Sequence, residues 1–310
     1  MEKEESPDYD RISKAMFDAA KLGNDMVLES IFRFNPTLFM KVNSDGQSLL
    51  HLAILYRQVN VFRLIMSKGA YKNAMVQVVD NEGNNILHLA GKLAAEERFR
   101  SMVLLMCSEE RWFTGVEEIV PSAFERMKNK NGKTPKELFY KEHKQLCGKA
   151  INDLNQVANI FLVVGTLIVT IGITAALTIR TNNVEGRTPM FDENTWYIIF
   201  RLSDGIGVSF TMISMLQYIS IMLFHSRKQR LDYVCSLQQR LITGNVFLVI
   251  ALGMLCTLAS MSADILVFAF FPKWTFCIIA TYCVFPVLWV FTIFKFGPLR
   301  PLILNKNVIF

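Results

Sequence analysis

The chain has 310 residues, of which 52% are hydrophobic, and a formal net charge of +6. A chain of this length predicts two domains, and nearly all the long apolar runs fall after residue 150. The positive charge is modest and much of it lies beside apolar runs, which argues against nucleic-acid binding. The acidic and polar N-terminus, MEKEESPDYD, is not expected to act as a secretory signal peptide.

Two stretches of the N-terminal half repeat. Residues 44–53 read SDGQSLLHLA and residues 81–90 read NEGNNILHLA. A weaker copy, KAMFDAAKLGN, lies at 14–24, and a partial one, NKNGKTPKELF, at 129–139. A period of about 33 residues with a T-P-L-H-x-A core is typical of ankyrin repeats. We therefore predict an all-α chain that begins with a short ankyrin-repeat solenoid of three repeats and a partial one.

The repeated glycines and histidines are interpreted as turn residues. Glycine tolerates the positive φ that a tight turn requires, and proline suits the first turn of a helix. A single histidine at this place is expected to hold the turn by hydrogen bonds rather than to bind a metal. The predicted structural residues of the turns are Gly46, His51, Gly83, His88, Gly132, Thr134 and Pro135.

The third repeat is interrupted by extra chain. Gly46 and Gly83 are 37 residues apart, whereas Gly83 and Gly132 are 49 residues apart. For residues 94–120 we predict a longer helix, followed by a turn at Pro121. Its two adjacent aromatic residues, Trp112 and Phe113, are expected to be packed core rather than a binding surface.

Three stretches at this junction resemble plant ankyrin-repeat membrane proteins of the accelerated-cell-death type, which carry a C-terminal PGG domain. The stretches are 87–93 (LHLAGKL), 112–121 (WFTGVEEIVP) and 129–146 (NKNGKTPKELFYKEHKQL). The resemblance covers nearly the whole chain and implies a membrane-tethered adaptor in plant stress or defence signalling. The loop that gives the family its Pro-Gly-Gly motif reads RTNNVEGRTPMF here, so no role of that motif can be transferred. The array is also short for the family, which puts in doubt partners that need a long concave groove.

Residues 154–179 contain no formal charge. As a helix this run would be roughly 39 Å long, which exceeds a hydrocarbon core of roughly 30 Å. Further apolar segments follow, and we predict a four-helix transmembrane bundle with spans near 156–179, 205–224, 241–263 and 274–294. The predicted domains are a cytosolic repeat domain at 1–146 and a PGG-like membrane domain at 147–310.

Charge bias predicts the orientation of the spans. Eleven lysines and arginines flank them on the side of the repeats, against four on the other side. Because basic residues stay in the cytosol, both termini and the repeats are predicted to be cytosolic. The expected membrane is the plasma membrane or the endoplasmic reticulum.

Polar residues inside the predicted spans have two interpretations. Thr166, Thr170 and Thr174 repeat every four residues and form a stripe that fits helix packing or a pore lining. Gln217 invites the same two interpretations. Asp204 and Asp264 lie at predicted outer helix ends, as interfacial residues or as an acidic vestibule for cations.

The function predicted from these patterns is a membrane-anchored scaffold without a cofactor or metal. Its expected partners are cytosolic or membrane proteins on the ankyrin face, membrane lipid and a second copy of the chain, but not nucleic acid. A cation channel or channel subunit formed by the spans is the alternative. An enzyme is not expected, because no glycine-rich phosphate loop, G-x-S-x-G motif or zinc-spaced cysteine–histidine cluster is present.

Overall fold

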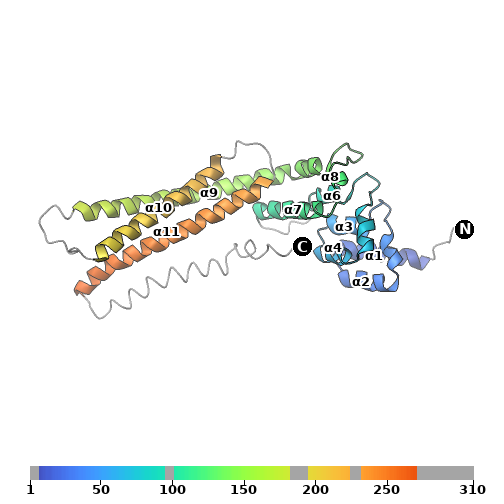
Figure 1. Cartoon of the computed structure of the whole chain (residues 1–310), viewed down its shortest axis with the longest axis horizontal. Coiled ribbons are helices and arrows are strands. Elements are labelled where there is room, and N and C mark those ends of the chain that lie inside the picture. The colour runs from blue at the N-terminus through green and yellow to red at the C-terminus, as the bar shows by residue number, and fades with distance from the viewer. Residues whose placement is uncertain (1–6, 95–100, 182–194, 224–231, 271–310) are drawn as a thin grey trace. The chain divides into compact units, whose positions relative to one another are not determined.

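The structure is a computed structural model that describes residues 7–94, 101–181, 195–223 and 232–270 (Figure 1). Within these ranges the regular structure is helical and contains no strand, as the sequence predicts. The described residues up to Ala150 form one compact unit, and those from Ile151 onward form a second.

The first unit consists of short helices that follow one another along the chain. They are α1 (Pro7–Leu22), α2 (Asp25–Phe34), the 3-10 helix η1 (Pro36–Met40), α3 (Leu49–Leu55), α4 (Val59–Met66), α5 (Ala70–Val76), α6 (Ile86–Ala90), α7 (Met102–Glu117), α8 (Ser122–Glu125) and the first part of α9 (Pro135–Thr181). Contacts run from α1 to α3, from α3 to α6 and from α6 to α7. The central α3 is buried from Leu49 through Ile54, because it is apolar on nearly every side and has neighbours on both flanks.

The extra chain between Gly83 and Gly132 folds as predicted. α7 is the longer helix, and it ends shortly before Pro121, which caps α8. Trp112 and Phe113 are both buried, at 3% and 5% exposure. The Trp112 ring lies 5.5 Å from Phe62, and Phe113 lies 4.6 Å from Phe139 of α9. The two aromatic residues therefore join α7 to α4 on one side and to α9 on the other.

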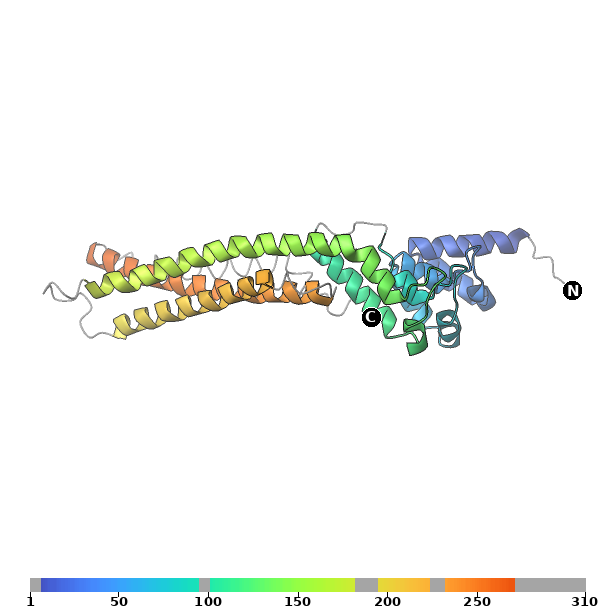
Figure 2. The ribbon, with the colours of Figure 1, turned by 90° about the horizontal axis from the view of Figure 1, so that it is seen from above.

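The second unit contains the apolar part of α9 together with α10 (Thr195–Leu223) and α11 (Asp232–Phe270), which run side by side (Figure 2). Three helices are long and apolar enough to cross a membrane, within 135–177, 202–223 and 234–255 of the described chain. The structure thus supports a membrane protein with at least these three candidate spans. The predicted fourth span, 274–294, lies outside the described residues.

The helices that carry the second and third predicted spans are longer than those spans. α10 begins ten residues before the predicted 205, and α11 extends from Asp232 to Phe270 rather than from 241 to 263. A single aspartate inside a helix costs only a fraction of a kcal/mol, about 0.7 or less, so Asp204 and Asp264 do not terminate helices. In the sequence the first strong helix breaker after α11 begins is Pro272.

Candidate functional site

Three loops of the first unit share one hydrogen-bonded geometry. We call them the first loop (43–47), the second loop (80–84) and the third loop (129–133). Each starts with Asn or Asp, whose side-chain oxygen accepts the backbone N–H groups two and four positions later, at 2.7 to 3.1 Å. The glycine three positions after it donates to the backbone carbonyl of the same residue, and its φ is 76°, 75° or 70°. Gly46, Gly83 and Gly132 therefore occupy equivalent left-handed positions, which a side chain would strain.

Consecutive loops are also bonded to one another. The backbone N–H of Asn81 donates to the Asp45 carbonyl at 2.9 Å, and that of Lys130 donates to the Glu82 carbonyl at 3.0 Å. A Cβ atom at Gly46 would lie 3.0 Å from the Asn81 nitrogen, and one at Gly83 would lie 3.1 Å from the Lys130 nitrogen. Two of the glycines are thus needed both for their φ and for the close approach of the next loop.

The buried histidines anchor the helix that follows each loop. His51 Nδ1 lies 2.8 Å from the hydroxyl of Ser48, which caps α3. His88 Nδ1 accepts from the Asn85 backbone N–H at 3.3 Å, and its Nε2 lies 3.0 Å from the Lys133 carbonyl of the third loop. The corresponding Nε2 of His51 has no hydrogen-bond partner among the residues that the structure describes, although the nearby Asn84 backbone favours the charged ring.

Burial lowers the pKa of His51 to about 4, from 6.5. The folded protein therefore holds this ring neutral at pH values where the unfolded chain binds a proton, and the stabilisation is lost as the pH falls from 6.5 towards 4. We expect the free energy of unfolding of the first unit to fall by about 2 kcal/mol between pH 7 and pH 5 through His51.

This pH dependence can be measured by urea unfolding of the full chain in detergent. A variant that keeps Trp112 as its sole tryptophan reports on the first unit. His51→Gln should unfold more easily at pH 7 and should show a flatter dependence on pH. An equal pH dependence in both proteins would contradict the assignment to His51.

Thr134 and Pro135 begin α9. The Thr134 backbone N–H donates to Glu137 at 2.9 Å, and the Glu137 N–H donates back to the Thr134 hydroxyl at 3.4 Å. The sequence Thr-Pro-x-Glu thus forms a reciprocal cap at the start of the helix. Pro135 occupies the first helical position, where a missing N–H is tolerated.

A buried ion cluster joins the turn that follows α3 to α7 and α9. Arg57 Nη2 lies 2.5 Å from Glu109 Oε2 of α7, and His143 Nε2 of α9 lies 3.1 Å from the same oxygen. Arg57 also donates to the carbonyls of Ile54, Ala90 and Lys92, at 2.7, 3.1 and 2.6 Å. Its backbone has a φ of 56°, which is unusual for a residue with a side chain.

The cluster is held by charge and by satisfied donors. The other nitrogen of His143, Nδ1, lies 3.0 Å from the Phe139 carbonyl, so both ring nitrogens face acceptor oxygens. Burial raises the pKa of Glu109, but hydrogen bonds from His143 and Arg57 outweigh this effect and hold that pKa below its ordinary value.

The threonine stripe does not line the contacts among the described helices. Thr166, Thr170 and Thr174 are exposed, and each hydroxyl donates to a carbonyl of its own helix three or four residues earlier, at 2.7 to 2.8 Å. Their hydroxyls are thereby satisfied without a neighbouring helix or water.

Other polar residues of the membrane helices pack between them. The Ser214 hydroxyl donates to the Gly244 carbonyl of α11 at 2.8 Å, and the Tyr218 hydroxyl lies 2.7 Å from Asn245. Gln217 is half-buried beside Gly244. Small residues here allow close approach of α10 and α11, and their hydroxyls bond across the contact.

Asp204 lies inside α10 rather than at its end. The side chain is 5% exposed, and the structure shows no hydrogen-bond partner for its Oδ1 atom among the described residues. A Cβ atom at Gly172 of α9 would lie 3.2 Å from that oxygen, so the glycine leaves room for the carboxylate. The side chain of the other predicted acidic residue, Asp264, lies outside the described part of α11.

The fold and these sites define a helical protein that combines a unit of hydrogen-bonded loops with helices able to cross a membrane. No protein-family model matches the chain, and a comparison with curated proteins finds no match. Within the described residues, no cluster of three or more His, Cys, Asp or Glu side chains is arranged to hold a metal.

Proposed function

We propose that this protein is a membrane-anchored adaptor of the ankyrin-repeat type, which binds protein partners through its N-terminal repeats. The observation that carries the proposal is the row of three equivalent loops, each bonded to the next through the backbone. Such a row presents side chains at fixed spacing without performing chemistry, which is how repeat proteins bind their partners.

The tips of the loops supply the binding side chains. Ser44, Asp45, Glu82, Lys130 and Asn131 are exposed, and most of these side chains make no hydrogen bond within the described chain. Because their backbones are already ordered, a partner that binds them pays little conformational entropy. A short row of this kind suits a small epitope rather than a long helical ligand.

The apolar helices serve as the anchor in this proposal. Four spans place both termini and the repeats in the cytosol, at the plasma membrane or the endoplasmic reticulum, in accordance with the charge bias of the flanking residues. The exposed faces of the helices contact lipid and could join a second copy of the chain. The sequence resemblance suggests plant stress or defence signalling as the setting.

A cation channel formed by the spans is the second candidate. The observation that favours it is buried Asp204, whose Oδ1 atom has no hydrogen-bond partner within the described chain. An ionisable residue in a membrane segment is costly unless it serves an ion pathway or has a partner. The threonine stripe gives the channel less support, because its hydroxyls bond within their own helix.

One pair of experiments separates the two functions. The exchange Asp45→Lys with Lys130→Glu reverses two exposed loop-tip charges and keeps the net charge unchanged. We expect it to abolish the copurification of protein partners from native membranes, whereas Asp204→Asn and Thr170→Val retain them. Purified protein in planar bilayers should carry no cation current.

Two results would contradict the proposed adaptor function. The first is an undiminished set of partners for the loop-tip variant. The second is a cation current that falls in Asp204→Asn, most strongly at low salt, where a charge at a pore mouth is least screened.

A further inference from the structure

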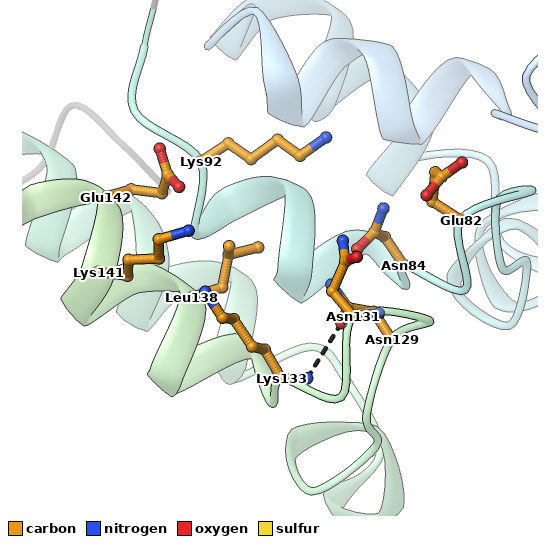
Figure 3. A pocket seen from close by; sticks show the side chains of 9 residues that line it. All are labelled: Glu82, Asn84, Lys92, Asn129, Asn131, Lys133, Leu138, Lys141 and Glu142. Atoms are coloured by element: carbon orange, nitrogen blue, oxygen red, sulfur yellow. Dashed lines mark hydrogen bonds between the residues drawn. The ribbon is translucent and has the colours of Figure 1, made fainter.

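A cavity of about 430 Å³ lies beside the second and third loops of the first unit (Figure 3). Its walls come from these two loops, from the residue that follows the cap of α6 and from the first turns of α9. Cavities of about 300–1,000 Å³ are typical of sites for small ligands. Two of its lining residues, Glu82 and Asn131, are also among the loop-tip residues of the proposed adaptor surface, but that role does not require a ligand in the cavity.

Three lysines surround the cavity. Lys133 and Lys141 extend toward each other beside Leu138, and Lys92 reaches across from the end of α6 (Figure 3). None of the three ammonium groups forms an ion pair within the described part of the chain. The pKa of Lys133 is lowered, first by the close contact between its amino group and that of Lys141, and then by burial and by the repulsion between the two positive charges. An anion placed between them would remove that repulsion.

The floor of the cavity can donate hydrogen bonds. Asn84 and Asn129 are buried at 3% and 7% exposure. The Asn129 amide donates to Asn84 Oδ1 at 2.9 Å, and the Asn84 amide donates to Asp80 at 3.0 Å. Since each amide nitrogen carries two hydrogens, each of the two side chains has a second N–H that these bonds do not use.

Two glutamates limit the positive region. Glu82 and Glu142 are exposed and also line the cavity, so the three lysines leave a net charge of +1 among its side chains. An extended polyanion would pass over these carboxylates and be repelled. A compact anion that fits between the lysines would not, because its charge stays inside the cavity.

We propose that this cavity binds a compact anion with more than one phosphate group, of the inositol-polyphosphate class, held between Lys92, Lys133 and Lys141. Lysine binds phosphate as a mobile point charge, and several lysines around one cavity suit several phosphate groups. The same chemistry occurs in a soluble inositol polyphosphate and in the headgroup of a phosphoinositide lipid. The inference does not rest on the adaptor function, since an adaptor or a channel could carry such a ligand.

Calorimetric titration with inositol hexakisphosphate tests the proposal, with the full chain in nanodiscs of phosphatidylcholine. Lys133→Gln with Lys141→Gln should weaken binding about tenfold or more, through the loss of two charge-assisted contacts. Lys128→Gln with Lys149→Gln removes the same total charge from exposed positions outside the cavity and should change the affinity by about twofold or less.

A substitution at the edge of the cavity is expected to strengthen the binding of the anion instead of weakening it. Glu142→Gln removes a repulsive carboxylate and should strengthen binding about two- to fivefold. A gain of affinity cannot arise from misfolding. The proposal is overturned if the wild type does not bind the probe, if both lysine pairs weaken binding equally, or if Glu142→Gln leaves the affinity unchanged.

A second titration shows whether the phosphate groups come from a membrane lipid or from a soluble ligand. Nanodiscs that contain a phosphatidylinositol bisphosphate supply the same headgroup from the membrane. If the lipid fills the cavity, the apparent affinity for inositol hexakisphosphate falls in these nanodiscs. If the soluble ligand is the natural one, the affinity is the same in both kinds of nanodisc. Either result supports an anion site in the cavity.

Discussion

Glu109→Gln is expected to destabilise the first unit by about 3–5 kcal/mol, although it changes one oxygen to an amide nitrogen. Glu109 is 3% exposed and accepts hydrogen bonds from Arg57 and His143. The neutral amide leaves the buried Arg57 guanidinium without its counter-charge, and it places an NH₂ or a weaker acceptor beside the histidine. Removing one partner of a buried ion pair costs far more than removing an exposed one.

Glu29→Gln is the matched control. Glu29 also contacts two cations, Lys68 at 2.7 Å and Arg33 at 3.3 Å, but its side chain is 30% exposed. Water replaces the lost ion pair there, so we expect a much smaller loss of stability than for Glu109→Gln. Urea unfolding of the full chain, followed through Trp112, measures both variants. Comparable losses for the two would show that the Arg57–Glu109–His143 cluster adds nothing beyond a surface ion pair.

The contribution of the cluster to stability also depends on pH. The pKa of Glu109 is lowered in the folded state, so the carboxylate stabilises the fold above about 4.5 and this stabilisation is lost as the pH falls through the folded pKa. Glu109→Gln should remove that part of the acid sensitivity. The effect falls at lower pH than the one assigned to His51, and the two can therefore be separated in one titration.

Gly83→Ala should destabilise the first unit more than Gly132→Ala does. Both glycines have a left-handed φ, 75° and 70°, which costs a residue with a Cβ atom about 1–2 kcal/mol. At Gly83 the new Cβ would lie 3.1 Å from the Lys130 nitrogen, which donates to Glu82. Disturbing that bond adds about 1–3 kcal/mol. A Cβ at Gly132 would have no described atom within 4 Å, so only the cost of φ applies there.

Comparing the two glycine variants separates the cost of backbone strain at a left-handed φ from the cost of disturbing the contact between the second and third loops. Thermal or urea unfolding of the two full-length variants gives the difference directly. Equal destabilisation would mean that the second and third loops are held together by contacts other than the Lys130 to Glu82 bond. Gly148→Ala, at a helical position with open space, should be neutral or slightly stabilising and serves as a control for handling the variants.

The turns show what a repeated pattern can predict. Gly46, Gly83 and the two histidines are visible because they recur at the same offset. The Asn or Asp that opens each loop was missed, although it stands three residues before every one of the glycines and could have been found by aligning the loops. A short polar side chain at that spacing is a recognised turn signal.

The ion cluster could not be predicted in the same way. Arg57 and Glu109 are 52 residues apart, and Glu109 and His143 are 34 apart, with no repeat to relate them. The only local signal is a carboxylate on the α7 face that also carries Trp112 and Phe113. Sequence patterns report periodic neighbours, whereas this contact depends on how α7 and α9 pack.

The membrane helices show a related limit. Apolar runs predict where a chain can span a bilayer, but they do not predict where each helix ends. Polar residues outside the lipid can continue the same helix. Similarly, the period of Thr166, Thr170 and Thr174 is visible in the sequence, but the direction of their hydrogen bonds is not. Hydroxyls that bond to their own helix make the stripe compatible with lipid.

The constant loops and the variable chain between them have an evolutionary consequence. The first and second loops start 37 residues apart and the second and third 49 apart, yet all three close with the same bonds and stack through the same backbone groups. Selection can therefore lengthen the helical segment between loops, as α7 illustrates, without disturbing the register of the row. New surface can be added to such a protein one insertion at a time, while the framework that displays it stays unchanged.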